Sequence, residues 1–222
     1  MKSNMKNAIG FGEKIEGFDI PVLNEREIRA ASGIMFVFAS LSLLMIIFQK
    51  DFVLAKFFVL LFLLDFIIRV FVNPTFSPML IIGRLIVRNQ TPEYVGAPQK
   101  RFAWKIGFGL SATMFLLMNV LNTYSIITGL ICLICLIFLF FESAFGICLG
   151  CMFYPLFAKE EVKYCPGEVC EINERTSIQN VSMTQIWIVV AYVIAAIALV
   201  YGLKTIYSEM PSNLWQKIGV KK

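Results

Sequence analysis

The sequence predicts an all-α, polytopic helical membrane protein, and three observations lead to this prediction. Of 222 residues, 58% are hydrophobic and only 16% are charged, whereas an ordinary soluble domain carries about 25% charged residues. Five stretches of about 18 to 25 residues are nearly free of charge, which is the length of helix that crosses the hydrocarbon core of a bilayer. Very short links join two pairs of these stretches, so each pair is expected to form an antiparallel transmembrane hairpin.

The first predicted hairpin pairs the spans 30–48 and 52–72, with a link of three residues between them. The next apolar segment, 77–87, is too short to cross a bilayer. Arg84 and Arg88 accompany its aliphatic residues. This spacing predicts an amphipathic helix that lies in the membrane interface, with both arginines at the lipid headgroups.

The second predicted hairpin pairs the spans 104–121 and 125–149, again through a three-residue link. The two hairpins together make a four-helix core domain over residues 30–157. The rest of the chain divides into a polar N-terminal segment (1–29), a polar cysteine-containing loop (158–183), a fifth span (184–203) and a basic C-terminal tail (204–222).

The distribution of basic residues sets the expected orientation, because cytoplasmic loops carry an excess of lysine and arginine. Most of these residues fall inside when the N-terminus is placed in the cytoplasm, although the lysines of the tail then lie outside. Residues 1–29 have no apolar core that would mark a cleaved leader. The tryptophans, which often mark membrane interfaces, are expected to be anchors there: Trp104, Trp187 and Trp215.

Four stretches of the sequence resemble a bacterial membrane family catalogued as domain of unknown function 4395. They are residues 65–69 (DFIIR), 76–78 (FSP), 98–103 (PQKRFA) and 142–151 (ESAFGICLGC). The resemblance covers roughly residues 24–157. It implies a four-helix unit in the bacterial cytoplasmic membrane and no established activity. It also points toward sulfur chemistry, with a thioredoxin-like or sulfurtransferase protein as partner.

A Cys-x-x-Cys pair, Cys148 and Cys151, ends the fourth span. Two thiols at this spacing lie close enough for a disulfide, a persulfide relay or half of a metal site. The dipole at the C-terminus of a helix disfavours a thiolate. The pair is therefore expected to be reactive only if the helix breaks near Gly146 and a new helix starts at Cys148. The alternative is that Cys148 and Cys151 are two small residues that only pack where two helices cross.

A second pair, Cys165 and Cys170, brackets a Pro-Gly turn in the polar loop. One scheme makes this pair a shuttle that exchanges electrons or sulfur with Cys148 and Cys151. The other scheme closes one zinc or iron–sulfur site with all four cysteines. The sequence itself requires no cofactor, although the second scheme would need zinc or an iron–sulfur cluster, and two incidental loop thiols are the alternative to both.

Three charged residues, Asp65, Arg69 and Glu142, lie inside the predicted spans and away from the starts of these spans. Charges there are costly and normally face the bundle interior. Asp65 and Arg69 are four residues apart and can pair on one helix face, either to fix helix packing or to mark a pathway. Glu142 lies about two turns before Cys148. It could pair with Arg69 across the bundle or accept a proton from a cysteine. Cys132 and Cys135, in mid-span, are expected to be packing residues.

Three functions remain open on this evidence. The first is a thiol–disulfide or sulfane-sulfur relay that uses Cys148, Cys151, Cys165, Cys170 and Glu142. The second is a transporter for a small sulfur anion or a metal ion, and the third is a non-catalytic assembly subunit. The chain has no histidine, which removes the commonest general base and zinc ligand. Its basic residues lie at the ends of spans and do not indicate nucleic-acid binding.

Overall fold

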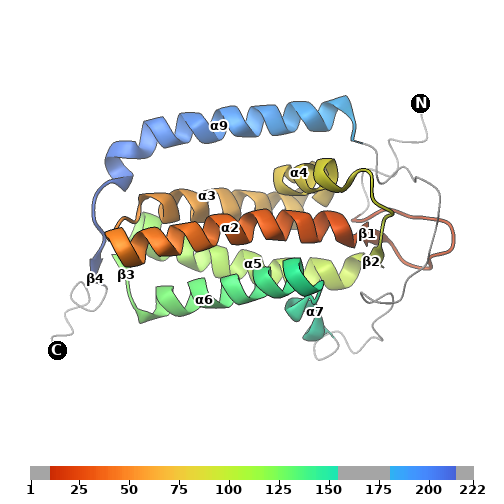
Figure 1. Cartoon of the computed structure of the whole chain (residues 1–222), viewed down its shortest axis with the longest axis horizontal. Helices are drawn as coiled ribbons and strands as arrows, with labels where there is room; N and C mark the ends of the chain where they lie inside the picture. The colour runs from red at the N-terminus through yellow and green to blue at the C-terminus, as the bar shows by residue number, and fades with distance from the viewer. Residues whose placement is uncertain (1–10, 155–180, 214–222) are drawn as a thin grey trace.

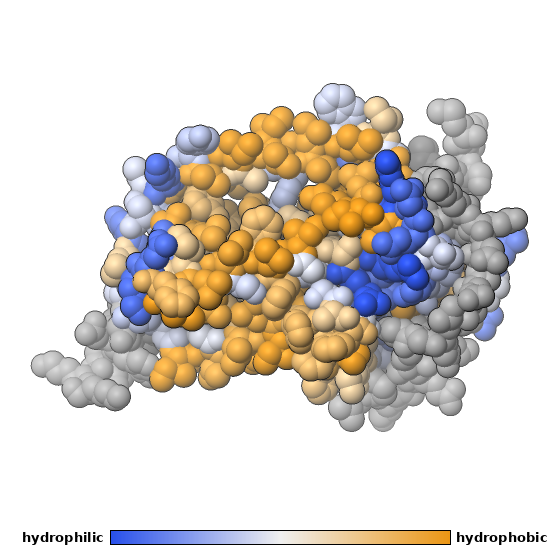
Figure 2. All heavy atoms as spheres, in the orientation of Figure 1, coloured by the Kyte–Doolittle hydropathy of each residue, from blue (hydrophilic) through white to orange (hydrophobic). Residues whose placement is uncertain are grey.

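The computed structural model describes residues 11–154 and 181–213, and helices make up most of this part of the chain (Figure 1). Figure 2 shows a broad apolar belt with hydrophilic residues toward both ends of the molecule on the face in view. The chain is therefore an all-α membrane protein, as the sequence predicts. Four helical segments are long and apolar enough to cross a membrane: Glu25–Gln49, Ala97–Val120, Ile126–Phe145 and Met183–Tyr207.

Helix α2 (Glu25–Gln49) begins earlier than the predicted first span. Asn24 caps it, because the Asn24 side chain accepts a hydrogen bond from the Arg26 backbone N–H at 3.2 Å. The acids of its first turn, Glu25 and Glu27, are buried and pair with cations on other helices. The helical pattern therefore extends into the polar segment that the sequence analysis assigned to the N-terminal region.

Helix α3 (Val53–Ile67) continues into a π-helical turn, η1 (Ile68–Val72). This continuous run matches the second predicted span. It is as apolar as the four segments named above but carries three charged residues spread along its length, Lys56, Asp65 and Arg69. All three side chains are buried.

Helix α4 (Pro78–Val87) corresponds to the predicted interfacial segment but packs closely along α2 (Figure 1). Arg88 is exposed. Arg84 is buried and pairs with Glu27, with Nε 2.8 Å from Oε2. The prediction that Arg84 lies at the headgroups is therefore wrong, because a carboxylate on α2 offers it a closer partner.

A glycine allows α4 to approach α2 this closely. A Cβ atom at Gly83 would clash with the Glu27 carbonyl oxygen and would lie 3.1 Å from the Ala31 nitrogen. No side chain larger than hydrogen fits at this crossing without moving the helices apart. The amphipathic pattern of residues 77–87 could not reveal this, since a helix buried against protein and one lying on lipid share the same period.

Helix α5 (Ala97–Phe115) continues into the π-helical turn η3 (Leu116–Val120). Helix α6 (Ile126–Phe140) continues into η4 (Phe141–Phe145). The fourth predicted span ran to residue 149, but the helix ends at Gly146. Figure 1 shows α2, α3, α5 and α6 side by side with the two short links at one end of the group.

Two small sheets, one at each end of the bundle, join segments of the chain that are distant in sequence. Strand β1 (Val22–Asn24) pairs antiparallel with β2 (Tyr94–Gly96) immediately before α5. At the opposite end, β3 (Thr123–Tyr124) pairs in parallel with β4 (Ser212–Asn213). Their strands are too short for the sequence pattern to predict.

Helix α9 (Met183–Tyr207) lies along α3 and α4, outside the other long helices (Figure 1). A few polar side chains hold it. The Gln185 side chain donates to the Thr75 carbonyl oxygen in the short 3-10 helix η2 (Pro74–Phe76) at 3.1 Å. Near the end of α9, the Lys56 ammonium donates to the Glu209 carbonyl oxygen at 2.9 Å. Most of the other side chains of α9 are exposed and apolar, as expected for a helix that faces lipid.

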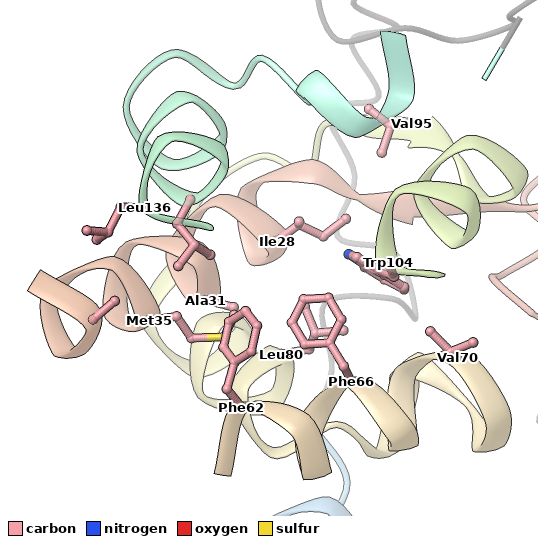
Figure 3. Close-up of a cluster of buried hydrophobic side chains, with 12 residues drawn as sticks. Ile28, Ala31, Met35, Phe62, Phe66, Val70, Leu80, Val95, Trp104 and Leu136 are labelled. Carbon is pink, nitrogen blue, oxygen red and sulfur yellow. The ribbon is translucent and has the colours of Figure 1, made fainter. Parts of the chain in front are cut away.

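The apolar core gathers side chains from α2, α3, α4, α5 and α6 (Figure 3). Trp104 belongs to this core, with 3% of its surface exposed, and Arg69 lies over its ring at 5.4 Å. The prediction that Trp104 is an interface anchor is therefore wrong. Trp187 is exposed near the start of α9, and Trp215 lies outside the described residues.

Candidate functional site

Cys148 and Cys151 form a disulfide, with their Cα atoms 5.2 Å apart. The pair lies where η4 ends and a one-turn helix, α7 (Leu149–Met152), begins. The two sulfurs differ in access, since Cys148 is 7% exposed and Cys151 is partly exposed. An incoming thiolate therefore reaches Cys151 more easily than Cys148.

The chain breaks between the two helices at Gly146. Gly146 has a φ of 69°, a left-handed conformation that glycine adopts at low cost. The Gly146 N–H bonds to the Glu142 carbonyl oxygen, and the Ile147 N–H bonds to that of Phe141, which is a Schellman-type end. Cys148 then caps α7, with its Sγ accepting from the Cys151 N–H at 3.2 Å. The sequence predicts a reactive pair only if the helix breaks near Gly146, and the structure has this break.

A buried ion cluster lies beside this break. The Lys100 ammonium of α5 is 2.8 Å from Glu25 Oε2 and 2.8 Å from Glu142 Oε1, with its side chain 1% exposed. We call Glu25, Lys100 and Glu142 the Lys100 cluster. The Ser32 hydroxyl also donates to Glu142 Oε2 at 3.2 Å. Glu142 is thus held by partners on α2 and α5, and the predicted pairing of Glu142 with Arg69 is wrong.

Arg29 is a further cation near this cluster. Two carboxyl groups face one ammonium in the Lys100 cluster, and the charge of Arg29 acts on the Glu25 carboxyl. The Arg29 guanidinium donates to the Ala144 carbonyl oxygen at 3.3 Å and lies against Gly146. A cation at this position also interacts favourably with the C-terminal carbonyls of η4.

Asp65 and Arg69 form a second buried pair, as the sequence predicts. Arg69 Nε lies 2.6 Å from Asp65 Oδ2. The other carboxylate oxygen of Asp65 accepts from the Ser77 hydroxyl at 2.7 Å and from the Met79 backbone N–H at 3.1 Å. These bonds join α3 to the start of α4. The contacts are those of a pair that fixes helix packing, which is one of the two predicted roles.

A third pair, Glu27 and Arg84, lies at the same end of the molecule with Glu13 nearby. Burial raises the pKa of the Glu13 carboxyl, and the charge of Arg84 partly offsets this effect. Three acid–base groups therefore lie at the end of the bundle that holds the disulfide, and two of them, the Lys100 cluster and the pair Glu27–Arg84, join separate segments of the chain.

A small cavity of about 40 Å³ connects the disulfide with the Lys100 cluster. Cys148, Glu142 and Trp104 line it together with apolar side chains of α3, α5 and α6. The helix α7 is pressed against α5 here, since a Cβ at Gly150 would lie 2.7 Å from the Ala103 Cβ. Cys148 of the disulfide and Glu142 of the Lys100 cluster thus border the same cavity.

The other predicted thiols are placed as follows. Cys132 and Cys135 are free and partly buried in α6, where they pack against the core as predicted. Cys165 and Cys170 lie outside the described residues. Within residues 11–154 and 181–213, no group of three or more cysteine, aspartate or glutamate side chains is placed to hold a metal ion.

Sequence reasoning missed Lys100 and Glu25 as members of the site. Lys100 entered the sequence analysis only as part of the family stretch 98–103 and, with Arg101 and Lys105, as a basic residue that sets membrane orientation. Spacing along the helix could have indicated a buried position for Lys100, because Lys100, Trp104 and Ser111 share one helix face. All three side chains are buried, whereas Arg101 and Lys105 are exposed. Glu25 had no comparable signal, because it precedes the apolar part of its helix.

Comparison with known proteins gives one match. A family model described as "Domain of unknown function (DUF4395)" matches residues 23–159, which is more than half of the chain. The match includes α2 to α7, with both the disulfide and the Lys100 cluster. No curated protein and no solved structure matches the chain.

Proposed function

We propose that this chain, which belongs to the DUF4395 family, is a membrane thiol relay in which Cys148 and Cys151 are the reactive pair. One observation carries the proposal: a bonded Cys-x-x-Cys pair at a helix break at Gly146 shares a cavity with a partly buried carboxylate, that of Glu142. Packing alone explains neither the bond nor the break. Reactive disulfides of this kind exchange with partner thiols through mixed disulfides.

The difference in access between the two sulfurs sets the order of the exchange. A partner thiolate attacks Cys151 Sγ, the Cys148–Cys151 bond breaks, and Cys148 leaves as a thiolate with the bonding electron pair. The Cys151 N–H, 3.2 Å from Cys148 Sγ, stabilises that thiolate. A second partner thiol then attacks the mixed disulfide and displaces Cys151. The chain gains two electrons and two protons, and the partner becomes a disulfide.

Glu142 is the proposed proton partner of Cys148. It lines the same cavity as the Cys148 sulfur and is about 15% exposed, so it can exchange protons with water at the edge of the bundle. Lys100 and Ser32 hold its carboxylate in place. In the reverse direction, Glu142 takes the proton that Cys148 releases when the dithiol is oxidised.

The relay has a sulfur-transfer form that uses the same residues. The reduced Cys151 thiolate takes the outer sulfur atom of a partner persulfide and carries it as its own persulfide, while the partner leaves as a thiolate. Cys165 and Cys170 are the proposed shuttle between this pair and a partner. A thioredoxin-like or sulfurtransferase protein is the partner class that fits either form.

We propose five membrane crossings, with the N-terminus in the cytoplasm of a bacterial cell. Helix α3 crosses although it carries charges, because Asp65 and Arg69 neutralise each other inside the bundle. The disulfide then lies at the cytoplasmic edge, where thiols are kept reduced. This placement supports a pair that cycles, and it argues against a role in oxidising exported proteins.

The two alternatives have less support from the described contacts. A transporter needs a polar path, whereas the cavity of about 420 Å³ between α2, α3, α5 and α6 is lined mostly by apolar side chains and includes none of Asp65, Arg69 and Glu142. An assembly subunit needs no reactive thiol. The experiment below distinguishes that role from the relay.

Single cysteine variants test the assigned order of attack. After full reduction, Cys148→Ser retains the accessible thiol and is expected to form a mixed disulfide with a small aromatic disulfide reagent. Cys151→Ser retains the buried thiol, and its reaction is expected to be slower by about tenfold or more. The reaction is followed by release of the chromophoric thiol, in a background with Cys165 and Cys170 changed to serine. Equal rates in the two variants would overturn the order, and two inert variants would overturn the relay.

A further inference from the structure

A cavity of about 420 Å³ lies between α2, α3, α5 and α6. It extends from the end of the bundle with the two short links, marked by Lys50 and Tyr124, to Cys135 in mid-helix. Its volume falls within the range of small-molecule sites in proteins. Phe62 and Cys135 line both this cavity and the small cavity at the disulfide. The site is thus distinct from the proposed relay but adjoins it.

Small residues on the facing helices leave this space open. Gly129 of α6 faces the cavity, and a Cβ atom there would meet nothing within 4 Å. Its backbone is not in the left-handed region that favours glycine. Neither conformation nor close packing therefore requires a glycine, which weakens a helix interior relative to alanine. Ala39 and Ala55 widen the same space from α2 and α3.

The polar groups inside the cavity are already satisfied. The Ser42 hydroxyl donates to the Phe38 carbonyl oxygen at 2.7 Å, and the Ser111 hydroxyl donates to that of Phe108 at 2.9 Å. The Thr128 hydroxyl donates to the Ser125 carbonyl oxygen at 2.7 Å. Apart from these side chains and those at the rim, the lining is apolar or thiol-bearing. An occupant of the interior is therefore apolar, since a polar group would lose its hydrogen bonds to water without replacement.

The rim supplies a positive charge. Lys50 lines the mouth with an exposed side chain, next to Tyr124 and Ser125. Within residues 11–154 and 181–213, no carboxylate forms an ion pair with it. A cation at the end of an apolar cavity is complementary to an amphiphile with an anionic head.

We propose that this cavity binds one apolar chain of an anionic membrane amphiphile, with the head at Lys50 and the chain running toward Cys135. Free fatty acids and anionic phospholipids share this chemistry. An empty space of this size would leave its lining without contact partners. A lipid chain fills it at no cost in buried polar groups, and the surrounding membrane supplies such chains.

The test uses the full-length protein in nanodiscs with a diazirine-bearing palmitate or a phosphatidylglycerol with the same label. Light-induced labelling of the unaltered protein is expected on cavity residues of α2, α3, α5 or α6. Gly129→Leu fills the cavity and is expected to reduce this labelling by about tenfold or more. Gly109→Leu is the matched control, because Gly109 is exposed on α5, has nothing within 4 Å and does not line the cavity.

The labelled palmitate and the labelled phosphatidylglycerol show whether the cavity takes a free fatty acid or a phospholipid chain. Labelling of the cavity by either lipid supports the proposal. Lys50→Gln is expected to weaken labelling by the anionic probes and not by a diazirine-bearing fatty alcohol. Labels confined to the outer surfaces of the helices, or equal labelling of the Gly129 and Gly109 variants, would overturn the proposal. The position of the label in the unaltered protein decides the question even if Gly129→Leu does not fold.

Discussion

Replacing Lys100 with methionine is expected to destabilise the folded protein by about 3–5 kcal/mol, which is typical when one partner of a buried ion pair is removed. Lys100 is 1% exposed and contacts the carboxylates of both Glu25 and Glu142. Without it, two acids remain buried side by side. The free energy of unfolding is measured by titration with sodium dodecyl sulfate in mixed micelles.

Lys105→Met is the control for this prediction, since Lys105 lies on the same helix and is exposed. It is expected to change the free energy of unfolding by less than about 0.5 kcal/mol. Combining Lys100→Met with Glu25→Gln and Glu142→Gln removes all three charges and should recover part of the loss. If Lys100→Met and Lys105→Met unfold alike, the Lys100 cluster does not hold the bundle together.

Asp65→Asn is expected to have a similar cost of about 3–5 kcal/mol, because it leaves the Arg69 guanidinium buried and unpaired. Asp65 also receives hydrogen bonds from Ser77 and the Met79 backbone, so the contact between α3 and α4 should loosen. The same titration measures the effect, and hydrogen exchange of α4 reports the loosening.

The matched control is Glu93→Gln, which breaks the pair between Arg26 and Glu93. Both of those side chains are about one-third exposed, at 33% and 35%. Exposed pairs contribute about 0–1 kcal/mol, so Glu93→Gln should change stability little. Equal losses in the two variants would contradict the assigned difference between a buried pair and a surface pair.

Local patterns in the sequence predict the helices well, because apolar length and short links depend only on neighbouring residues. The break at Gly146 was not predicted, since the fourth span was expected to run to residue 149 and the break was named only as the condition for a reactive pair. Trp104 and Arg84 were misplaced for one common reason. An aromatic or arginine side chain near the end of an apolar segment has the same local pattern whether it meets lipid headgroups or a neighbouring helix.

The members of the Lys100 cluster come from three separate segments, which explains why only one of them was predicted. Glu142 stood out as an acid without a partner in its own span. Its true partner lies 42 residues earlier in the chain, and sequence spacing gives no measure of such a contact. The sequence could not predict the cavity lined by Gly129 either, because the open space depends on how four helices pack together.

The redox state of Cys148 and Cys151 in native membranes tests the central claim most directly. Free thiols are blocked with one isotopic form of a maleimide, and the remaining disulfides are then reduced and labelled with the other form. Mass spectrometry quantifies both forms before and after addition of a reduced thioredoxin-like protein. The relay predicts that the pair converts from disulfide to dithiol, with one partner disulfide formed for each pair reduced. A pair that keeps its initial state with this partner and with a persulfide donor would contradict the account.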